Sequence, residues 1–263
     1  MKKNPNTSPT KHINIRHERN NVALPFSYIG PLLHLGAMPA VVYFALSEES
    51  SLTLDPFNQP AIHLSNFPMR IFSFTLPHHG SKLDPKKAMT QWANDFIQEI
   101  DPLDPFLDNV AITLNELIEQ KVITKLGLMG LSRGAFIAMH VAAKLKAVTH
   151  ILGFAPLITF ASLHEFDALS SLVLVQKYDP YDLVPILYNR SIRLYISNYD
   201  QRVGTKNAFS WIEALSHHAH EKGVRTAPIE LYIRPPIGYL GHGTAKETFI
   251  DGSCLLYTSD AAD

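Results

Sequence analysis

Two patterns of hydrophobic residues, one typical of strands and one of helices, alternate along most of the chain. Short runs rich in apolar and β-branched residues alternate with longer stretches in which apolar residues recur every three or four positions. The strand-like runs lie at 39–47, 70–76, 125–130, 147–154, 191–197 and 228–234, and the helical stretches at 86–100, 109–120, 135–146 and 206–222. We expect Pro102 and Pro105 to end the first helix. Strands alternating with amphipathic helices predict an α/β fold with a mostly parallel central sheet flanked by helices.

One segment, at about 157–190, breaks this alternation. It carries phenylalanine, tyrosine and leucine side chains among acidic residues, at spacings that indicate short helices. It predicts a lid-like insertion over the sheet, roofing an apolar pocket. No linker or internal repeat divides the chain, so we expect a single domain over 22–253, preceded by a loose, polar and basic lead-in over 1–21.

Composition and charge narrow the classes of function. The formal net charge is −1, so nothing points to nucleic acid or an anionic membrane as a partner. No apolar run reaches the roughly 20 residues that cross a bilayer. The single cysteine, Cys254, excludes an internal disulfide framework and fits a reducing, cytoplasmic location. We therefore expect a small-molecule substrate as the partner.

A G-x-S-x-G motif stands at Gly130-Leu-Ser132-Arg-Gly134, between the strand-like KLGLMG and the helical AFIAMHVAAKL. A sharp turn between strand and helix exposes the serine hydroxyl in a strained conformation, and the helix N-terminus favours a developing oxyanion. Gly130 and Gly134 are expected because a side chain there would collide with neighbouring backbone. Ser132 is the predicted nucleophile, and the alternative is an ordinary N-cap serine.

The chain resembles bacterial α/β hydrolases of the dienelactone-hydrolase and prolyl-oligopeptidase type from about residue 39 to 251. The resemblance rests on GLSRGA, SNYDQRVGT and PPIGYLGHGT, which occur in the order of the family. It implies the α/β-hydrolase fold, a Ser, acid, His triad in that chain order, and no cofactor.

The serine needs a histidine base, which in turn needs an acid. The resemblance assigns these roles to His242, in a glycine-rich loop after the last strand, and to Asp200, directly after SIRLYIS. Asp179 and Asp182 are rivals for the acid but lie in the insertion, and Asp251 follows the histidine, which is the wrong order. The histidines at 217, 218 and 220 are interpreted as a solvated helix face, and no metal site is predicted.

Acyl transfer also needs two backbone N–H groups for the oxyanion. The first is expected from Arg133, immediately after the nucleophile. Where many relatives have His-Gly, this chain has Ala45-Leu46, so the second donor is expected from Ser47. The PHHG turn with His78 and His79 resembles a family loop that shapes the site without doing chemistry.

These observations predict a serine hydrolase that cleaves a carboxylic ester or thioester through an acyl-Ser132 intermediate, which water activated by His242 then hydrolyses. Two alternatives stay open. One is a peptidase of the prolyl-oligopeptidase type, although these 263 residues show no gating propeller. The other is an inactive hydrolase fold used for binding.

The last ten residues, 254–263 (CLLYTSDAAD), resemble a translated sequencing adapter at every position. A helix with a capping-box start is expected over Thr244–Ile250, with Ala245, Phe249 and Ile250 buried and Gly252 interrupting it. We therefore expect 254–263 to be a non-native tail that packs against no core element.

Overall fold

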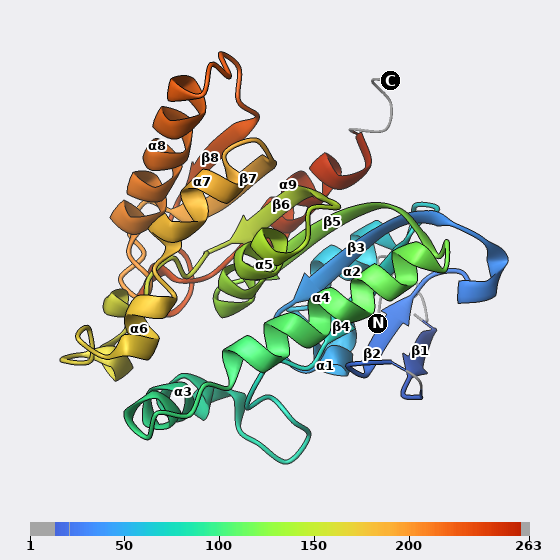
Figure 1. Ribbon diagram of the computed structural model, residues 1–263, viewed down its shortest axis with the longest axis horizontal. Helices are drawn as coiled ribbons and strands as arrows, with labels where there is room; N and C mark the ends of the chain where they lie inside the picture. Colours follow the sequence, from blue (N-terminus) through green and yellow to red (C-terminus); the bar gives the residue numbers. More distant parts are fainter. Residues whose placement is uncertain (1–13, 21, 259–263) are drawn as a thin grey trace, which may run out of the picture.

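The computed structural model describes residues 14–20 and 22–258, without the side chains of 257 and 258. Its strands form one twisted sheet in the order β1-β2-β4-β3-β5-β6-β7-β8 (Figure 1). Their bounds are β1 Ile15–Glu18, β2 Phe26–Ile29, β3 Met38–Phe44, β4 Arg70–Phe74, β5 Ile123–Leu131, β6 Val148–Phe154, β7 Ser191–Ser197 and β8 Ile229–Arg234. Strand β2 is antiparallel to both neighbours and the other pairs are parallel. The predicted α/β class with a mostly parallel sheet is confirmed.

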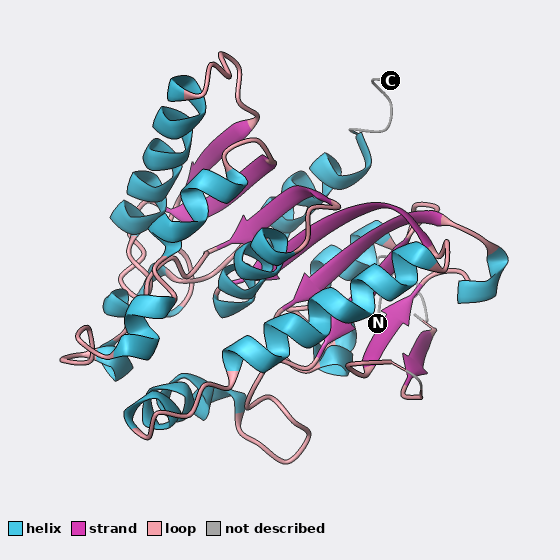
Figure 2. Cartoon of the chain, viewed as in Figure 1, coloured by secondary structure: helices cyan, strands magenta, loops and turns pink. Residues whose placement is uncertain are grey.

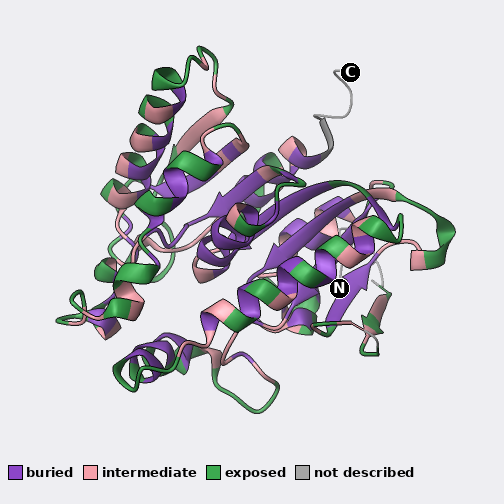
Figure 3. Ribbon diagram, in the orientation of Figure 1, coloured by how far each residue is buried: buried purple, intermediate pink, exposed green. Residues whose placement is uncertain are grey.

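Helices cover both faces of the sheet (Figure 2). One face carries α3 Ala88–Ile97, α4 Leu103–Glu119, α5 Arg133–Lys144, α7 Val184–Leu187 and α8 Thr205–Glu221. The other carries α1 Glu48–Thr53, α2 Gln59–Leu64 and α9 Lys246–Thr258. Each layer has its own cluster of buried apolar side chains, so the central strands are buried on both sides (Figure 3).

The insertion consists of short helices, as its spacing predicts: 3-10 turns at Phe160–Ser162, His164–Phe166 and Pro180–Leu183, together with α6 Val173–Lys177 and α7. Its aromatic residues do not roof a pocket, however. Phe160 stacks on Phe166 at 4.5 Å between ring centroids and meets the ring of Phe136 on α5 at 4.8 Å. These rings are buried in the main core because the segment packs down on α3 and α5.

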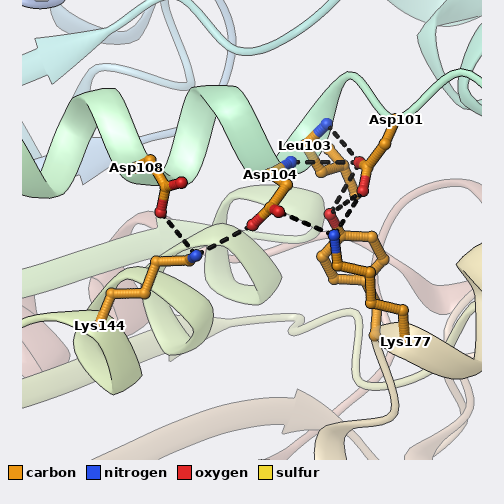
Figure 4. A network of polar contacts seen from close by, with 7 residues as sticks. Asp101, Leu103, Asp104, Asp108, Lys144 and Lys177 are labelled. Atoms are coloured by element: carbon orange, nitrogen blue, oxygen red, sulfur yellow. Dashed lines mark hydrogen bonds and ion pairs between the residues drawn. The ribbon is translucent and has the colours of Figure 1, made fainter.

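A network of acidic and basic side chains fixes the insertion to the body of the fold (Figure 4). Lys177 of α6 lies 2.9 Å from Asp101 and 2.8 Å from Asp104, at the start of α4. The hydroxyl of Tyr178 donates to Asp101 at 2.8 Å, and Lys144 of α5 joins Asp104 at 2.9 Å. Burial and the neighbouring carboxylate of Asp101 raise the pKa of Tyr178 above its usual range, so its hydroxyl remains a donor.

The hydrophobic pattern missed several short elements. It also placed the start of one helix at 109, whereas α4 begins at Leu103. Strands β1 and β2 and helices α1 and α2 are too short to show a clear period, and β1 lies within the stretch expected to be a loose lead-in; residues 1–13 and 21 lie outside the described residues. Pro102 and Pro105 do not end the preceding helix as expected, because α3 already ends at Ile97. Pro102 is the N-cap of α4 and Pro105 lies in its first turn, where a missing N–H has no intrahelical acceptor to lose.

The expected packing of the C-terminus was wrong over the part that the structure describes, whereas the non-native origin of 254–263 stays a prediction. Helix α9 runs through Gly252 to Thr258, and Phe249, Gly252, Ser253 and Leu256 form its buried face. A β-carbon at Gly252 would lie 2.7 Å from Cε1 of Phe154, so glycine allows the helix to pack closely on β6. The spacing 249, 252, 253, 256 is helical and places these four residues on one face of α9, without the interruption expected at Gly252. Residues 259–263 lie outside the described residues.

Leu256→Ala should lower the free energy of unfolding by about 2 kcal/mol, because it deletes buried methyl groups from the apolar cluster between α9 and the sheet. Denaturant unfolding measures this change. The neighbouring Leu255, which is only half-buried, is the matched control, and Leu255→Ala should cost less than half as much. Equal effects of the two substitutions would contradict the packing of α9.

His140 makes the core sensitive to acid. Its ring on α5 is buried between the rings of Phe136 and Tyr178, with distances between ring centroids of 4.1 Å and 5.5 Å. Burial is the main cause that lowers its pKa to about 4. A histidine with a lowered folded-state pKa stabilises the fold fully above about pH 6.5, the value of the unfolded chain. This stability is lost as pH falls from 6.5 towards 4.

His140→Leu should therefore flatten the acid dependence of stability. Between pH 6.5 and 4.5 the wild type should lose about 2 kcal/mol more unfolding free energy than the variant, as measured by urea unfolding at each pH. The exposed His217, changed to leucine, is the control and should leave the acid slope as it is. Parallel slopes in wild type and His140→Leu would refute the role of His140.

Candidate active site

Ser132 lies in the sharp turn between β5 and α5, with φ 55° and ψ −118°. This left-handed conformation costs a non-glycine residue about 1–3 kcal/mol and persists only where the surroundings impose it. Here two backbone hydrogen bonds impose it: the Ser132 amide donates to Phe154 O at 2.8 Å, and the Leu157 amide donates to Ser132 O at 3.1 Å. The turn is thereby tied to the end of β6, and the serine side chain is presented at the edge of the sheet.

The two motif glycines allow this turn. A β-carbon at Gly134 would lie 1.9 Å from the carbonyl oxygen of Phe44, at the end of β3. A β-carbon at Gly130 would lie 2.2 Å from both Gly134 and the amide of Ala135. Neither backbone neighbour can move aside as a flexible side chain would, so both positions require glycine for close approach.

The side chains of Ser132, His242 and Asp200 meet in one hydrogen-bonded chain. Nε2 of His242 lies 2.9 Å from Oγ of Ser132, and its Nδ1 lies 2.7 Å from Oδ2 of Asp200. Because a carboxylate only accepts, Nδ1 carries the proton and Nε2 is free to accept one from the serine. The three residues follow β5, β8 and β7, so the carboxyl ends of parallel strands bring them together.

Asp200 is held from two directions. Its carboxyl group is fully buried, and Oδ1 accepts the backbone amides of Arg202 and Val203, each at 2.9 Å. The other oxygen remains for His242. These amides fix the carboxylate orientation, and through it the plane and tautomer of the imidazole.

The rival residues lie elsewhere. Asp179 caps the 3-10 turn at Pro180–Leu183, Asp182 is exposed, and Asp251 on α9 accepts from Tyr195 and Arg234. Ser132 stands at the N-cap position of α5 but makes no side-chain capping bond, which removes the ordinary N-cap interpretation.

The histidine-rich stretches have structural surroundings. On α8, the side chains of His217 and His220 are exposed as expected, whereas His218 is half-buried against Tyr188. In the PHHG turn, His78 bonds Asp95 of α3 at 2.6 Å, and the buried His79 bonds Pro77 O at 2.8 Å. In the described part of the chain, no hydrogen bond joins either of these two residues to Ser132, His242 or Asp200.

The two expected amide donors differ in their surroundings. Arg133 is the first residue of α5, so the helix itself offers its N–H no acceptor and leaves it free beside Ser132. Ser47 caps α1 through its side chain and does not line the apolar cavity at Ser132. The two residues before it, Ala45 and Leu46, do line that cavity. The Leu46 amide already donates to Ser51 Oγ at 2.9 Å. The source of a second donor thus stays a prediction.

Two cavities of different chemistry adjoin the triad, and both are lined by Ser132, Arg133 and His242. The first, of about 280 Å³, is apolar and lined by Leu46, Pro56, Phe57, Ile237 and Phe249. The second, of about 520 Å³, faces the insertion and combines apolar side chains with charged ones: Met89, Leu157, Leu163, Lys86, Glu165 and Arg202. The apolar pocket is therefore formed without the insertion, which instead lines the charged one.

Two further findings concern the described residues only. Residues 14–20 and 22–258 hold no group of three or more histidine, cysteine, aspartate or glutamate side chains placed to bind a metal ion. In the same ranges, every helix is too short or too polar to span a bilayer.

Comparisons with known proteins bear on the fold. No family model matches the sequence, and no curated protein matches it. Among solved structures, TT1662 from Thermus thermophilus matches with a TM-score of 0.72 and 17% identity, over 95% of this chain and 100% of that one. A cold-adapted esterase from an Arctic intertidal metagenomic library matches with a TM-score of 0.64 and 15% identity, over 97% and 98%.

A prolyl endopeptidase matches with a TM-score of 0.62 and 14% identity, over 95% of this chain but only 39% of its own. An S-formylglutathione hydrolase from Agrobacterium tumefaciens matches with a TM-score of 0.55 and 14% identity, over 94% and 93%. Esterases and a peptidase thus share the fold of this chain. The chain has the α/β-hydrolase fold.

Proposed function

We propose that this protein is a serine hydrolase that cleaves carboxylic esters or thioesters. The observation that carries the proposal is the continuous chain of hydrogen bonds from Ser132 through His242 to the buried Asp200. A strained serine on a sharp turn, an imidazole within 2.9 Å and a carboxylate behind it form the arrangement that activates a hydroxyl nucleophile.

The reaction follows from these positions. Oγ of Ser132 attacks the substrate carbonyl while Nε2 of His242 takes its proton, and Asp200 stabilises the imidazolium that forms. The amide of Arg133 donates to the developing oxyanion, supported by the positive end of α5. His242 then returns the proton to the leaving group, and in the second half-reaction it activates the water that releases the acid and frees Ser132.

An ester or thioester fits better than a peptide. The esterase is matched along 98% of its own length, whereas the prolyl endopeptidase is matched along 39%. The apolar cavity beside Ser132 accommodates a short acyl or alkyl group. A peptidase remains the second candidate because several peptidases share the fold, and an inactive binding protein is the third.

Ser132→Ala should remove about 10⁴- to 10⁶-fold of kcat on p-nitrophenyl esters, because only binding and the oxyanion site would remain. The thermal midpoint should stay near that of the wild type. A fluorophosphonate probe should label the wild type and not the variant, which separates an enzyme from a binding protein. A variant that keeps more than a tenth of the rate would rule out Ser132 as nucleophile.

Asp200→Asn should lower kcat/KM on the same esters by about 10²- to 10⁴-fold, because an amide can donate to Nδ1 and favour the wrong imidazole tautomer. Asp182→Asn, an exposed position in the insertion, is the matched control and should keep the wild-type rate. Aminoacyl-amide substrates measured alongside decide between esterase and peptidase. Faster turnover of the amides would favour the peptidase.

A further inference from the structure

The larger cavity beside Ser132 carries more positive than negative charge. Lys86, Arg133 and Arg202 border it, and Glu165 is its one carboxylate among the described residues that line it. The triad uses none of these side chains. Charge next to a reacting centre affects which substrates bind there, so it matters which of these charges is already neutralised.

Glu165 and Arg202 neutralise each other. The two terminal guanidinium nitrogens of Arg202, Nη1 and Nη2, donate to the two carboxylate oxygens of Glu165 at 2.7 and 2.6 Å. The carboxylate is nearly inaccessible, and its hydrogen bonds with Arg202 hold its pKa below the usual value despite burial. Nη1 of Arg202 also lies 3.0 Å from Nδ1 of His164. This bidentate pair forms one wall of the cavity and leaves no free acid there.

Arg133 has no such partner. Arg133 borders both cavities. Its guanidinium donates through Nη1 to the carbonyl oxygen of Pro85 at 3.0 Å, and the next residue, Lys86, lines the charged cavity and not the apolar one. Among the described residues, no carboxylate lies within ion-pair distance of it. Burial, and after it the like charge of Arg202, lowers the pKa of Arg133 to about 10, so the group is still a cation at neutral pH.

A partly desolvated cation without a counter-ion is costly in a folded protein. A guanidinium has five N–H donors, and the contact with Pro85 uses one of them. Its planar fork matches the two oxygens of a carboxylate. A residue needed only to anchor the loop at Pro85 would require neither the charge nor the remaining donors.

We propose that Arg133 binds a carboxylate on the substrate, so that the preferred substrate is an ester with an apolar group in the smaller cavity at Phe57 and an anionic group in the larger, charged cavity. This inference rests on the proposed hydrolase function and narrows its substrate class. Arg133 thus contributes twice: its amide faces the oxyanion, and its side chain selects the substrate. The carboxylate can belong to the acyl part or to the alcohol part of the ester.

Matched pairs of esters test the proposal. For the acyl part, mono-p-nitrophenyl adipate is compared with its neutral amide, p-nitrophenyl adipamate. For the alcohol part, 4-carboxyphenyl butyrate is compared with 4-carbamoylphenyl butyrate. The ratio of kcat/KM for the anionic to the neutral member is measured in the wild type and in variants, so that intrinsic reactivity cancels between proteins.

In at least one pair, Arg133→Met should lower this ratio by about 10- to 100-fold, the range of a charge-assisted hydrogen bond. Arg133→Lys, which keeps the charge but not the fork, should give an intermediate ratio. Lys87→Met removes an exposed charge of the same sign that borders a different hollow, and it should keep the wild-type ratio. The pair that responds shows which part of the ester carries the carboxylate.

The outcomes are distinguishable from failure of the proposed function. If the wild type hydrolyses neutral esters and labels at Ser132, but Arg133→Met keeps the wild-type ratio in both pairs, the inference is overturned and the hydrolase remains. If Arg133→Met does not fold, the wild type alone decides once each ratio is divided by the ratio of the two esters' non-enzymatic hydrolysis rates. It should then prefer the anionic adipate to the adipamate by about tenfold or more, or show its preference in the butyrate pair. Absence of preference in both pairs overturns the inference.

Discussion

The close approach of α5 to the sheet is the constraint on which the site depends. With no side chain at Gly134, the first turn of α5 lies against the carbonyl of Phe44, and Ser132 is forced into a left-handed conformation. The bonds of Ser132 to Phe154 and Leu157 hold it there from the neighbouring strand. Contacts with neighbouring strands of the sheet therefore stabilise the strained backbone of Ser132. They hold the serine in one position, where its hydroxyl can bond to His242.

The same sheet edge also explains how the acid and base are held. Asp200 follows β7 in a turn whose amides bind one carboxylate oxygen, and His242 follows β8 in a loop that reaches back across the edge. Arg202, two residues after the acid, pairs with Glu165 of the insertion. The acid turn, the insertion and the charged cavity are thus parts of one connected arrangement, and the Lys177 and Tyr178 contacts fix its far side to α4.

Most long elements were predictable because each contains enough residues to show its hydrophobic pattern. Strands β3, β5, β6 and β7 are buried on both faces and appear as apolar runs, and α5 and α8 show a helical period over three turns or more. Strand β2 spans four residues and α2 spans six, too few for a period to emerge. At α9 the helical spacing is present, but Gly252 was expected to interrupt the helix, so Phe249, Gly252 and Leu256 were not predicted to form one face.

By itself, the sequence determined the α/β class and the turn at Ser132, because these depend on local spacing, and its resemblance to a known family pointed to His242 and Asp200. Only the tertiary structure decided which side chains share a cavity. The rings of Phe160 and Phe166 pack in the core against those of Phe136 and Phe96, Glu165 pairs with Arg202, and Arg133 has no carboxylate partner among the described residues. Such pairings join residues tens of positions apart, so their geometry follows from how the insertion packs on α3 and α5 and leaves no trace in local periodicity.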